Sequence, residues 1–380
     1  MDAEAEKVPL SSLVYEVAFR PRRAVRESVV LPSRPRVYNQ NMNIALLTSP
    51  EFLLHDTGSH VENAGRLRAV ESELKGLEGL TRRLPRLASD EELLRLHEPE
   101  VLERVRRASA AGGQWLDGDT FCSKDSDRVA RLAVGGTLDL VSSVLSGEFE
   151  RAFALGRPPG HHATPERSMG FCLFSTIALA ARHAVVVGGL ERVFIFDWDV
   201  HHGNGTQDCL YSDPSTCFCS FHQSPFYPGS GALRERGERA GEDLTYNLPL
   251  PAGMGDAEYL YAMEELVKPV LLAYDPQLIL VSAGYDAHRD DPLGGMRVTT
   301  GGFRKMARLI SLWSNQTAAQ GRIVGVLEGG YDAVALGQSV RATLEAWMET
   351  PVATAEAPAE TVSHVALKRI QEARKAWGIS

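Results

Sequence analysis

A short polar segment that follows an apolar run carries residue types able to hold a metal ion. Asp197, Asp199 and His201 stand at alternate positions after the apolar run 193–196, and glycines follow them. The apolar run predicts a buried parallel strand, and residues i and i+2 of an extended chain face the same way. Asp199 and His201 are therefore expected to reach one metal ion together at the carboxyl end of a sheet. A strand-end turn with solvated side chains would explain one Asp and one His, but not five polar or ionisable side chains in the eight residues 197–204.

Three other apolar runs lead into polar loops that contain glycine. The loops are RPPGHH at 157–162, SAGYD at 282–286 and EGGY at 328–331. In open parallel sheets, ligands bind outside the carboxyl ends of the strands. We therefore expect all four loops to meet in one rim. Charged groups beside core strands are costly unless they are paired or coordinated, which favours a functional interpretation of this rim.

The rim supplies the donor atoms of a hydrolytic zinc site. Such sites take three protein ligands from His and Asp or Glu and keep one position open for water. Asp199, His201 and Asp286 offer two oxygens and one nitrogen. In such a site the bound water becomes acidic and the metal polarises a substrate carbonyl.

His161 and His162 offer two imidazoles beside that metal. A single His at a strand end is more often a packed, hydrogen-bonded residue, but prolines and a glycine pin this pair. We expect one imidazole to take a proton from the water and the other to give a proton to a leaving amine. Tyr331, which follows two glycines, is a candidate for stabilising the developing oxyanion. Taken alone, a surface tyrosine on a tight turn is the simpler interpretation of Tyr331.

Strands that alternate with helices are expected to position the rim. The predicted strands are 44–47, 152–155, 193–196, 216–221, 278–281 and 323–327, and helical apolar faces lie within 132–145, 263–271 and 303–313. This alternation predicts a single α/β domain with a central, mostly parallel sheet flanked by helices on both sides.

Three parts of the chain are expected. Residues 1–42 are predicted to form an irregular N-terminal arm, residues 43–350 the catalytic domain, and residues 351–380 a linker and a C-terminal helix. The segment 351–361 is rich in Ala, Pro, Thr and Glu, as flexible linkers are. One face of the terminal helix is predicted to dock on the body or on a second subunit, through Val365, Ile370, Ala373 and Trp377.

Composition narrows the class of protein. The net charge of −9 gives no basic footprint for nucleic acid, and it suits a cationic partner only weakly. Five cysteines without a CxxC pair fit a reducing compartment and disfavour a ribbon-type zinc site. No segment has the apolar length of a membrane span. The acidic start, MDAE, is not typical of a signal peptide and argues against a transit sequence in the arginine-rich stretch 17–36. We expect a cytoplasmic protein that binds neither nucleic acid nor membranes.

Four motifs together resemble the zinc-dependent histone deacetylase family, in its class II and bacterial deacetylase-like branch with the arginase/deacetylase fold. They are RPPGHHA at 157–163, DWDVHHGNGT at 197–206, SAGYDAHRDDPLGG at 282–295 and LEGGYD at 327–332, and the resemblance covers roughly residues 43–345. It implies one zinc ion per chain, held by Asp199, His201 and Asp286. It also implies that His161 and His162 are the catalytic pair, with Asp197 oriented toward His161 and Asn204 toward His162, and that Tyr331 stabilises the oxyanion.

The resemblance implies two further features. A structural potassium ion would be held by the side chains of Asp197 and Ser220 and by the backbone carbonyls of Asp199, His201 and Phe221. A tunnel for the acyl-lysine side chain would be walled by Phe171, which follows Gly170, and by Tyr227. The family usually has Phe at the second position, so the tunnel is expected to be slightly more polar.

Two positions bear on substrate choice. The family's first loop commonly reads H-P-E-x-P-x-R, whereas residues 60–66 read HVENAGR. Val61 and Ala64 replace both prolines, so this loop is expected to be less rigid. Relatives that act on acetylated polyamines carry a glutamate where this chain has Leu293, and an apolar side chain there favours acyl-lysine.

The sequence thus predicts hydrolysis of N-acyl-lysine amides by metal-activated water. The first alternative is an acetylpolyamine or small acetylated-amine amidohydrolase of the same fold. An arginase-like enzyme with two metals would need more carboxylates near Asp286 than Asp290 and Asp291 provide. A catalytically weak module that binds acyl-lysine is a third alternative, against which intact His161, His162 and Tyr331 argue. The substrate, the acyl length and a homo-oligomeric state stay open.

Overall fold

The computed structural model describes residues 43–350 and 361–379, so the predicted N-terminal arm and most of the linker lie outside the described residues. Its centre is an eight-stranded sheet in the order β2-β1-β5-β10-β9-β6-β7-β8, and all neighbouring strands are parallel. The strands are β1 (Ile44–Leu47), β2 (Leu80–Arg83), β5 (Arg151–Ala154), β6 (Val193–Asp197), β7 (Thr216–Gln223), β8 (Thr245–Leu250), β9 (Leu278–Ala283) and β10 (Ile323–Leu327). A separate antiparallel hairpin consists of β3 (Gly113–Trp115) and β4 (Phe121–Ser123).

All six predicted strands form within two residues of their expected bounds, which confirms the predicted α/β class. The sequence did not indicate β2 and β8, the two edge strands of the sheet. β2 reads LTRR and is partly exposed, while β8 contains Pro249. An exposed edge strand such as β2 needs less apolar surface than a central one, so its apolar pattern is weaker. All six residues of β8 are buried, but its sequence TYNLPL is not a continuous apolar run.

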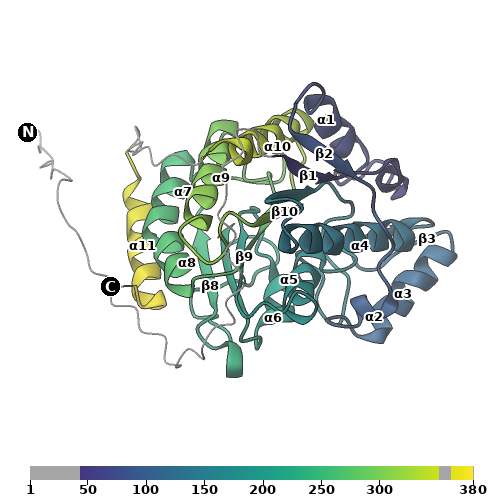
Figure 1. The fold of residues 1–380 in the computed structure, drawn as a ribbon, viewed down its shortest axis with the longest axis horizontal. Helices are drawn as coiled ribbons and strands as arrows, with labels where there is room; N and C mark the ends of the chain where they lie inside the picture. Colours follow the sequence, from purple (N-terminus) through teal and green to yellow (C-terminus); the bar gives the residue numbers. More distant parts are fainter. Residues whose placement is uncertain (1–42, 351–360, 380) are drawn as a thin grey trace, which may run out of the picture.

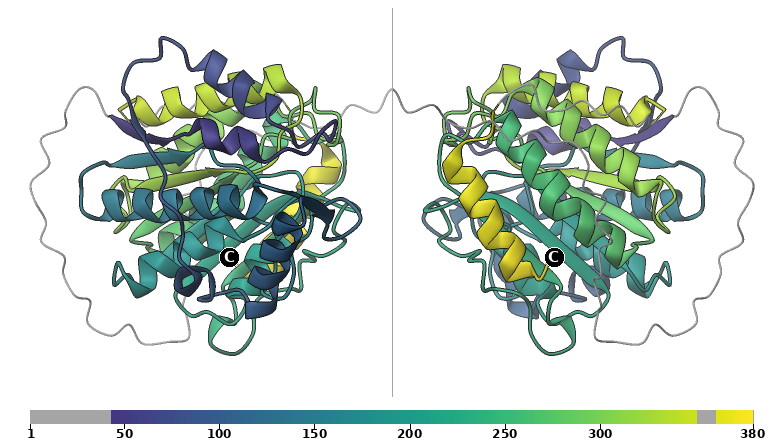
Figure 2. Two further views of the ribbon diagram at one scale, coloured as in Figure 1. Left: turned by 90° about the vertical axis from the view of Figure 1, so that its right-hand side faces the viewer. Right: turned by 90° about the vertical axis from the view of Figure 1, so that its left-hand side faces the viewer.

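Two layers of helices cover the sheet (Figure 2). One layer groups α2 (Asp90–Leu93), α3 (Pro99–Ala110), α4 (Ser126–Leu145), α5 (Thr176–Val186) and α6 (Asn204–Leu210). The other groups α1 (Gly65–Glu73), α7 (Asp256–Ala262), α8 (Lys268–Tyr274), α9 (Thr300–Ser314) and α10 (Ala333–Met348), with a π-helical turn, η3 (Met263–Val267), between α7 and α8. Short 3-10 turns are η1 (Pro50–Leu54) and η2 (Arg239–Gly241).

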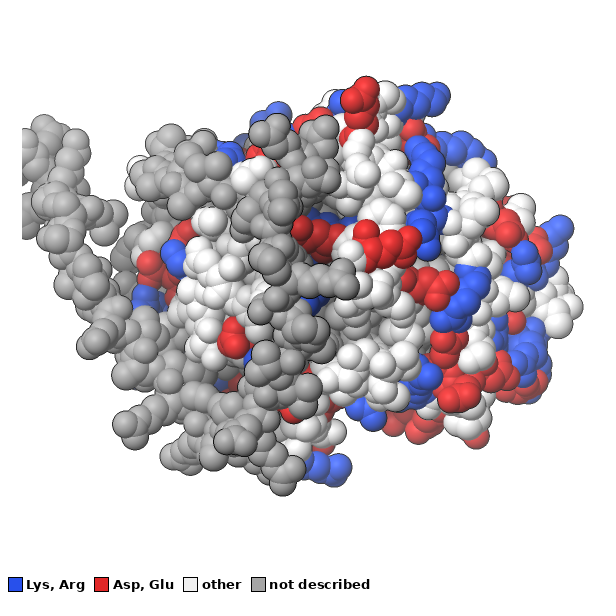
Figure 3. All heavy atoms as spheres, in the orientation of Figure 1, with Lys and Arg blue, Asp and Glu red and all other residues white. Residues whose placement is uncertain are grey.

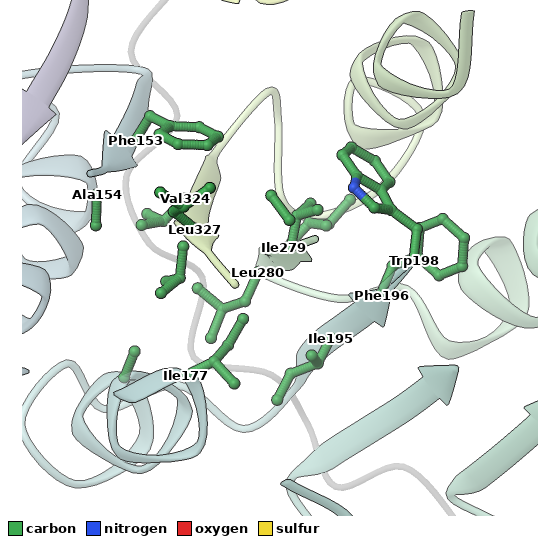
Figure 4. Packing of buried hydrophobic residues seen from close by; sticks show 14 of the residues in the cluster. Phe153, Ala154, Ile177, Ile195, Phe196, Trp198, Ile279, Leu280, Val324 and Leu327 are labelled. Carbon is green, nitrogen blue, oxygen red and sulfur yellow. The ribbon is translucent and has the colours of Figure 1, made fainter. Parts of the chain in front are cut away.

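The apolar core lies between the sheet and these layers. Figure 4 shows side chains of the four central strands in one cluster, with Ile177 of α5 packed against them. The residues of the predicted helical faces are buried, among them Met263, Leu266, Phe303 and Ile310. The exception is Leu145, which is half-buried. A rigid core of this kind fixes the carboxyl ends of the strands relative to one another, and the functional side chains follow those ends.

The C-terminal helix α11 (His364–Trp377) docks on the body, at edge strand β8 and beside α7 (Figure 1). Trp377 packs against Tyr246 of β8, with ring centroids 5.1 Å apart. One predicted contact is wrong: Val365 is 58% exposed, and Ala366 lies in the buried face instead. The helix begins after Ser363, whose side chain accepts a hydrogen bond from the Ala366 backbone. The other three predicted residues of this face, Ile370, Ala373 and Trp377, are buried as expected.

Two surface observations complete the fold. No helix in the described ranges is long and apolar enough to cross a membrane. On the face shown in Figure 3, basic and acidic side chains of the described residues intermingle.

Candidate active site

Four adjacent strands carry the predicted rim. In the sheet, β5, β10, β9 and β6 stand side by side, and their carboxyl ends lead into the loops 157–162, 328–331, 282–286 and 197–204. Because all four strands are parallel, these loops meet at one edge of the sheet. The sequence order of the strands hides this adjacency, which only the sheet topology reveals.

Asp199, His201 and Asp286 converge at this edge. One ligand atom from each lies within 4.8 Å of the others, and all three side chains are buried. Nδ1 of His201 is 3.1 Å from Oδ1 of Asp199 and 3.1 Å from Oδ2 of Asp286. Their expected placement on an extended strand is wrong, because β6 ends at Asp197. A bend brings Asp199 and His201 together instead, and the Asp199 carboxylate accepts a hydrogen bond from the His201 backbone at 2.9 Å.

The surroundings of this cluster suit a cation. A Cβ atom at Gly284 would lie 1.9 Å from Oδ2 of Asp199, and one at Gly329 would lie 2.1 Å from Oδ2 of Asp286, so only glycine leaves room for both carboxylates. Burial and the neighbouring Asp199 carboxylate raise the pKa of Asp286 to about 7. A bound cation would offset both effects, since it compensates buried negative charge. The donor set and the glycine-lined space therefore fit a metal ion with oxygen and nitrogen ligands.

His161 pairs with a buried carboxylate. Its Nδ1 is 3.0 Å from Oδ2 of Asp197, and its Nε2 is 3.9 Å from Oδ1 of Asp199. Burial lowers the pKa of His161, but the charges of Asp199 and Asp197 outweigh this effect and raise it well above its ordinary value. A Cβ at Gly203 would lie 2.3 Å from the Asp197 carboxylate, so this glycine too makes room for the pair.

His162 pairs with an amide instead. Its Nδ1 lies 2.8 Å from Oδ1 of Asn204, the first residue of α6. Burial and the positive charges of His161 and His201 lower the pKa of His162 well below its ordinary value. The rings of His161 and His162 are 4.0 Å apart, so two imidazoles with opposite tendencies to hold a proton stand side by side. Such a pair is suited to general acid–base chemistry.

Tyr331 lies on the loop after β10 and contacts two side chains from other loops. The guanidinium of Arg66 lies 5.0 Å from the centre of its ring, and the ring of Phe171 stands at 90° to it with centroids 5.8 Å apart. Burial raises the pKa of Tyr331 well above its ordinary value, so the hydroxyl stays a proton donor.

Gly170, Phe171 and Tyr227, three of the residues predicted to line the tunnel, lie close to His162 or Tyr331. Phe171 has a φ of 68°, in the left-handed region that bulky residues rarely adopt. Its backbone N–H donates to Oγ1 of Thr120 at 3.1 Å, which helps hold this conformation. A Cβ at Gly170 would lie 2.5 Å from the His162 ring, so glycine is required there too. Tyr227 packs edge-on against His162, with centroids 5.1 Å apart.

Leu293 is half-buried, on the loop that follows β9. Its backbone N–H donates at 2.9 Å to the carboxylate of Asp291, which also accepts from the backbone of Tyr331 at 2.6 Å. One carboxylate therefore ties the loop of Leu293 to the loop of Tyr331. Sequence reasoning considered Asp291 only as a possible second-metal ligand and missed this connection.

The side chains predicted to hold potassium stand on adjacent strands. Asp197 of β6 and Ser220 of β7 are register partners. Ser220 Oγ lies 3.0 Å from Nδ1 of His222. Phe221 follows on the same strand and is fully buried.

Two buried carboxyl groups beneath the rim were not assigned a role from the sequence. Glu62 forms a two-pronged ion pair with Arg157, at 2.6 and 2.7 Å, and also bonds Arg66 at 3.1 Å. Arg66 in turn donates to the backbone carbonyls of Gly330, at 2.7 Å, and Glu328. The first loop is thus anchored to both the Arg157 and the Tyr331 loops. The charged pair at i and i+4 of HVENAGR was the available signal.

Glu328 holds the backbone of the histidine loop. Its carboxylate accepts hydrogen bonds from the N–H groups of Gly160, at 2.6 Å, and His161, at 3.1 Å. Burial is the main cause that raises the pKa of Glu328 to about 7. An acid directly before two glycines was visible in the sequence, but only the structure shows that it is buried and which loop it holds.

Comparisons with known proteins agree with this geometry. The profile of the histone deacetylase domain matches residues 60–347. A histone deacetylase-like amidohydrolase of Pseudomonas aeruginosa is 41% identical over 277 residues, which is 72% of this chain and 72% of that protein. A probable deacetylase of Methanothermobacter thermautotrophicus is 40% identical over 299 residues, 78% of this chain and 88% of that protein.

Plant proteins are similar to the same extent. Histone deacetylase 10, chloroplastic, of Oryza sativa is 38% identical over 350 residues, 86% of this chain and 77% of that protein. Among solved structures, the HDA15 HD domain superposes with a TM-score of 0.81 at 32% identity, and the match covers 88% of this chain and 94% of the other. The chain therefore belongs to the histone deacetylase family.

Proposed function

We propose that this member of the histone deacetylase family is a zinc-dependent hydrolase that removes acetyl or longer acyl groups from N-acyl-lysine side chains. The observation that supports this most strongly is the meeting of Asp199, His201 and Asp286 with the differently partnered pair His161 and His162 at one edge of the sheet. A site that only binds ligands has no need for two imidazoles with opposed protonation.

One zinc ion per chain would be held by Asp199, His201 and Asp286, whose oxygen and nitrogen donors match the ligands of hydrolytic zinc sites. When bound, the metal acidifies water and polarises the substrate carbonyl. We also propose a structural potassium ion at the side chains of Asp197 and Ser220 and at the carbonyls of Asp199, His201 and Phe221. It is supported by the adjacency of Asp197 and Ser220 in the sheet.

The hydrogen bonds of the histidine pair support an assignment of its protons. The amide oxygen of Asn204 only accepts, so Nδ1 of His162 carries the proton and its Nε2 keeps a lone pair. Nε2 of His162 is therefore the atom that takes the proton of the attacking water. The Asp197 carboxylate stabilises protonated His161, which we assign to giving a proton to the leaving amine nitrogen.

Tyr331 and the tunnel residues orient the substrate. The protonated hydroxyl of Tyr331 donates to the oxyanion that forms as the carbonyl is attacked. Phe171 and Tyr227 wall the apolar stem of the lysine and exclude water from it, and Leu293 lies on the loop beside Tyr331. We further propose that residues 43–350 are the catalytic unit, that the partner is an acylated protein or peptide, and that the protein acts in the cytoplasm.

Asp199→Ala tests this proposal. With one of three ligands lost, the chain is expected to lose both its bound zinc, measured by elemental mass spectrometry, and its deacetylation of acetyl-lysine peptides. The matched control is Asp290→Ala, which removes an exposed acid four residues after Asp286 and is expected to keep both. Stoichiometric zinc together with full turnover in Asp199→Ala would show that the metal site lies elsewhere.

The same assay separates the alternatives. Wild-type protein should turn over acetyl-lysine peptides many times, whereas a binding module would show affinity without turnover. Faster hydrolysis of acetylspermidine than of any acyl-lysine peptide would favour the acetylpolyamine amidohydrolase.

A further inference from the structure

The hairpin of β3 and β4 carries an aromatic side chain that the core does not bury. Trp115 is 57% exposed, although tryptophan is the largest apolar side chain. Its ring packs against its cross-strand partner Phe121, with centroids 5.1 Å apart, and lies 6.4 Å from the ring of His60. Trp115 is thus held in place on one side and open to solvent on the other.

Contacts connect this hairpin to the predicted tunnel. The ring of His60 meets Phe171 edge-on, with centroids 4.5 Å apart, and Phe171 meets Tyr331. The turn of the hairpin also holds Phe171 directly, since Thr120 accepts a hydrogen bond from its backbone. A continuous run of rings therefore leads from Tyr331 out to Trp115. The aromatic ring left exposed at the end of this run is available to contact a bound ligand through its face.

Two carboxylates accompany Trp115 on the turn. Asp117 accepts hydrogen bonds from the backbone of Asp119, at 3.0 Å, and of Thr120, at 2.7 Å. Within the described part of the chain, neither carboxylate forms an ion pair with Lys or Arg. Both raise the pKa of the Tyr227 hydroxyl, after burial, and their effect exceeds the opposite effect of Arg167. The turn therefore places negative charge beside the tunnel wall.

An exposed indole face and two unpaired carboxylates are complementary to a cation. We propose that Trp115, with Asp117 and Asp119, selects substrates by binding a cationic side chain, Arg or Lys, next to the acyl-lysine in a peptide. The inference rests on the proposed function and adds a sequence preference to it. The flanking residue lies outside the tunnel, so its recognition is separate from that of the acyl-lysine stem.

The test compares acetyl-lysine peptides that carry Arg, Ala or Glu directly before or after the acetylated residue. Wild type should show the highest kcat/KM with Arg and the lowest with Glu at one of these positions. Trp115→Ala should reduce the preference for Arg over Ala about 2- to 5-fold, as expected for a cation–π contact at an exposed site. Trp115→Phe, which keeps a smaller ring, should retain part of the preference.

Asp117→Asn with Asp119→Asn keeps the turn's acceptors and removes its charge. This double variant should reduce discrimination between Arg and Glu and should weaken the salt dependence of that discrimination. The matched control is Val187→Ala, an equally exposed apolar residue directly after α5. It precedes the amino end of β6, whereas the site lies at the carboxyl ends of the strands. Thermal unfolding of each variant verifies its fold.

Two results overturn the inference in distinguishable ways. Equal kcat/KM for Arg, Ala and Glu peptides in wild type, or an equal loss for all three in Trp115→Ala, would overturn this inference alone. If wild type cleaved no acyl-lysine peptide, the proposed function would fail and this inference with it.

Discussion

The floor and the mouth of the site are built in different ways. The floor is a set of five fully buried carboxyl groups: Glu62, Asp197, Asp199, Asp286 and Glu328. The mouth is a set of side chains that are at least partly exposed: His60, Trp115, Phe171, Tyr227 and Leu293. Each floor carboxylate accepts at least two hydrogen bonds or ion pairs from fixed partners, whereas the mouth side chains are held by ring contacts and the backbone of their loops.

This difference indicates at which positions amino-acid substitutions are tolerated. A buried charge that loses its partner is strongly destabilising, so the floor admits few substitutions. An exposed ring or aliphatic side chain can be exchanged at little cost to stability. We therefore expect the chemistry to depend on the floor, and substrate choice to depend on the mouth.

Among the substitutions that test this difference between floor and mouth, Glu62→Ala is expected to have the largest effect. It leaves the guanidinium of Arg157 buried without its carboxylate, and it removes one partner of Arg66. We expect the free energy of unfolding at pH 7 to fall by about 3–5 kcal/mol, the usual cost of breaking a buried ion pair. Urea denaturation followed by circular dichroism measures this change. The control, Glu91→Ala, removes an exposed acid paired with Arg95 and should change stability by less than about 1 kcal/mol.

The pH dependence has a defined sign. Burial raises the pKa of Glu62, but the charge of Arg157 and the hydrogen bonds from Arg157 and His55 together outweigh burial and bring the pKa well below its ordinary value of 4.5. A carboxyl group with a lowered folded-state pKa stabilises the fold above its unfolded-state pKa and loses this contribution as the pH falls toward the folded value. The difference between wild type and Glu62→Ala should therefore be full at pH 6–7 and shrink on acidification below about pH 4. A difference that grew on acidification would contradict this assignment.

Tyr331→Phe acts at the boundary between floor and mouth. It deletes one hydroxyl on a loop held by Arg66 and Asp291, so the fold should persist. Loss of an oxyanion donor typically lowers turnover by about 10²–10³-fold. Steady-state kinetics on an acetyl-lysine peptide should show this loss in kcat. Tyr261→Phe, on the half-buried side of α7, is the control and should keep its rate. Near-full activity of Tyr331→Phe would mean that Tyr331 is only a loop residue.

The sequence predicted the central sheet well because its strands are continuous apolar runs. It also named the polar side chains that meet at the rim, because each follows such a run. The expected geometry of Asp199 and His201 was wrong, since the strand ends at Asp197 and a bend, not strand alternation, brings them together. Local patterns do not state where a strand stops, because the next loop's hydrogen bonds decide it.

The supporting contacts were not predictable in the same way. Glu62 meets Arg157 across 95 residues, and Glu328 meets His161 across 167. Such pairings depend on strand order, which the apolar pattern does not contain. The expected loss of rigidity in the loop with Val61 and Ala64 stays a prediction. In that loop Asn63 donates to the carbonyl of His60 at 2.8 Å and accepts from Gly65 at 2.8 Å.

Leu293→Glu, a substitution at the mouth, is expected to have the smallest effect, and it tests whether the mouth determines substrate choice. Leu293 offers no charge to a distant ammonium group, so wild type should prefer acetyl-lysine peptides to acetylspermidine. A carboxylate there should attract that ammonium and move the ratio of kcat/KM toward acetylspermidine by about 2- to 5-fold, the effect of an exposed charge pair. Leu293→Gln, which has a similar length but no charge, should leave the ratio near the wild-type value. Stability should barely change, since the backbone bond from residue 293 to Asp291 is kept. If wild type already preferred acetylspermidine, selection would lie elsewhere on the mouth, and the carboxylates of Asp117 and Asp119 would be the first groups to neutralise.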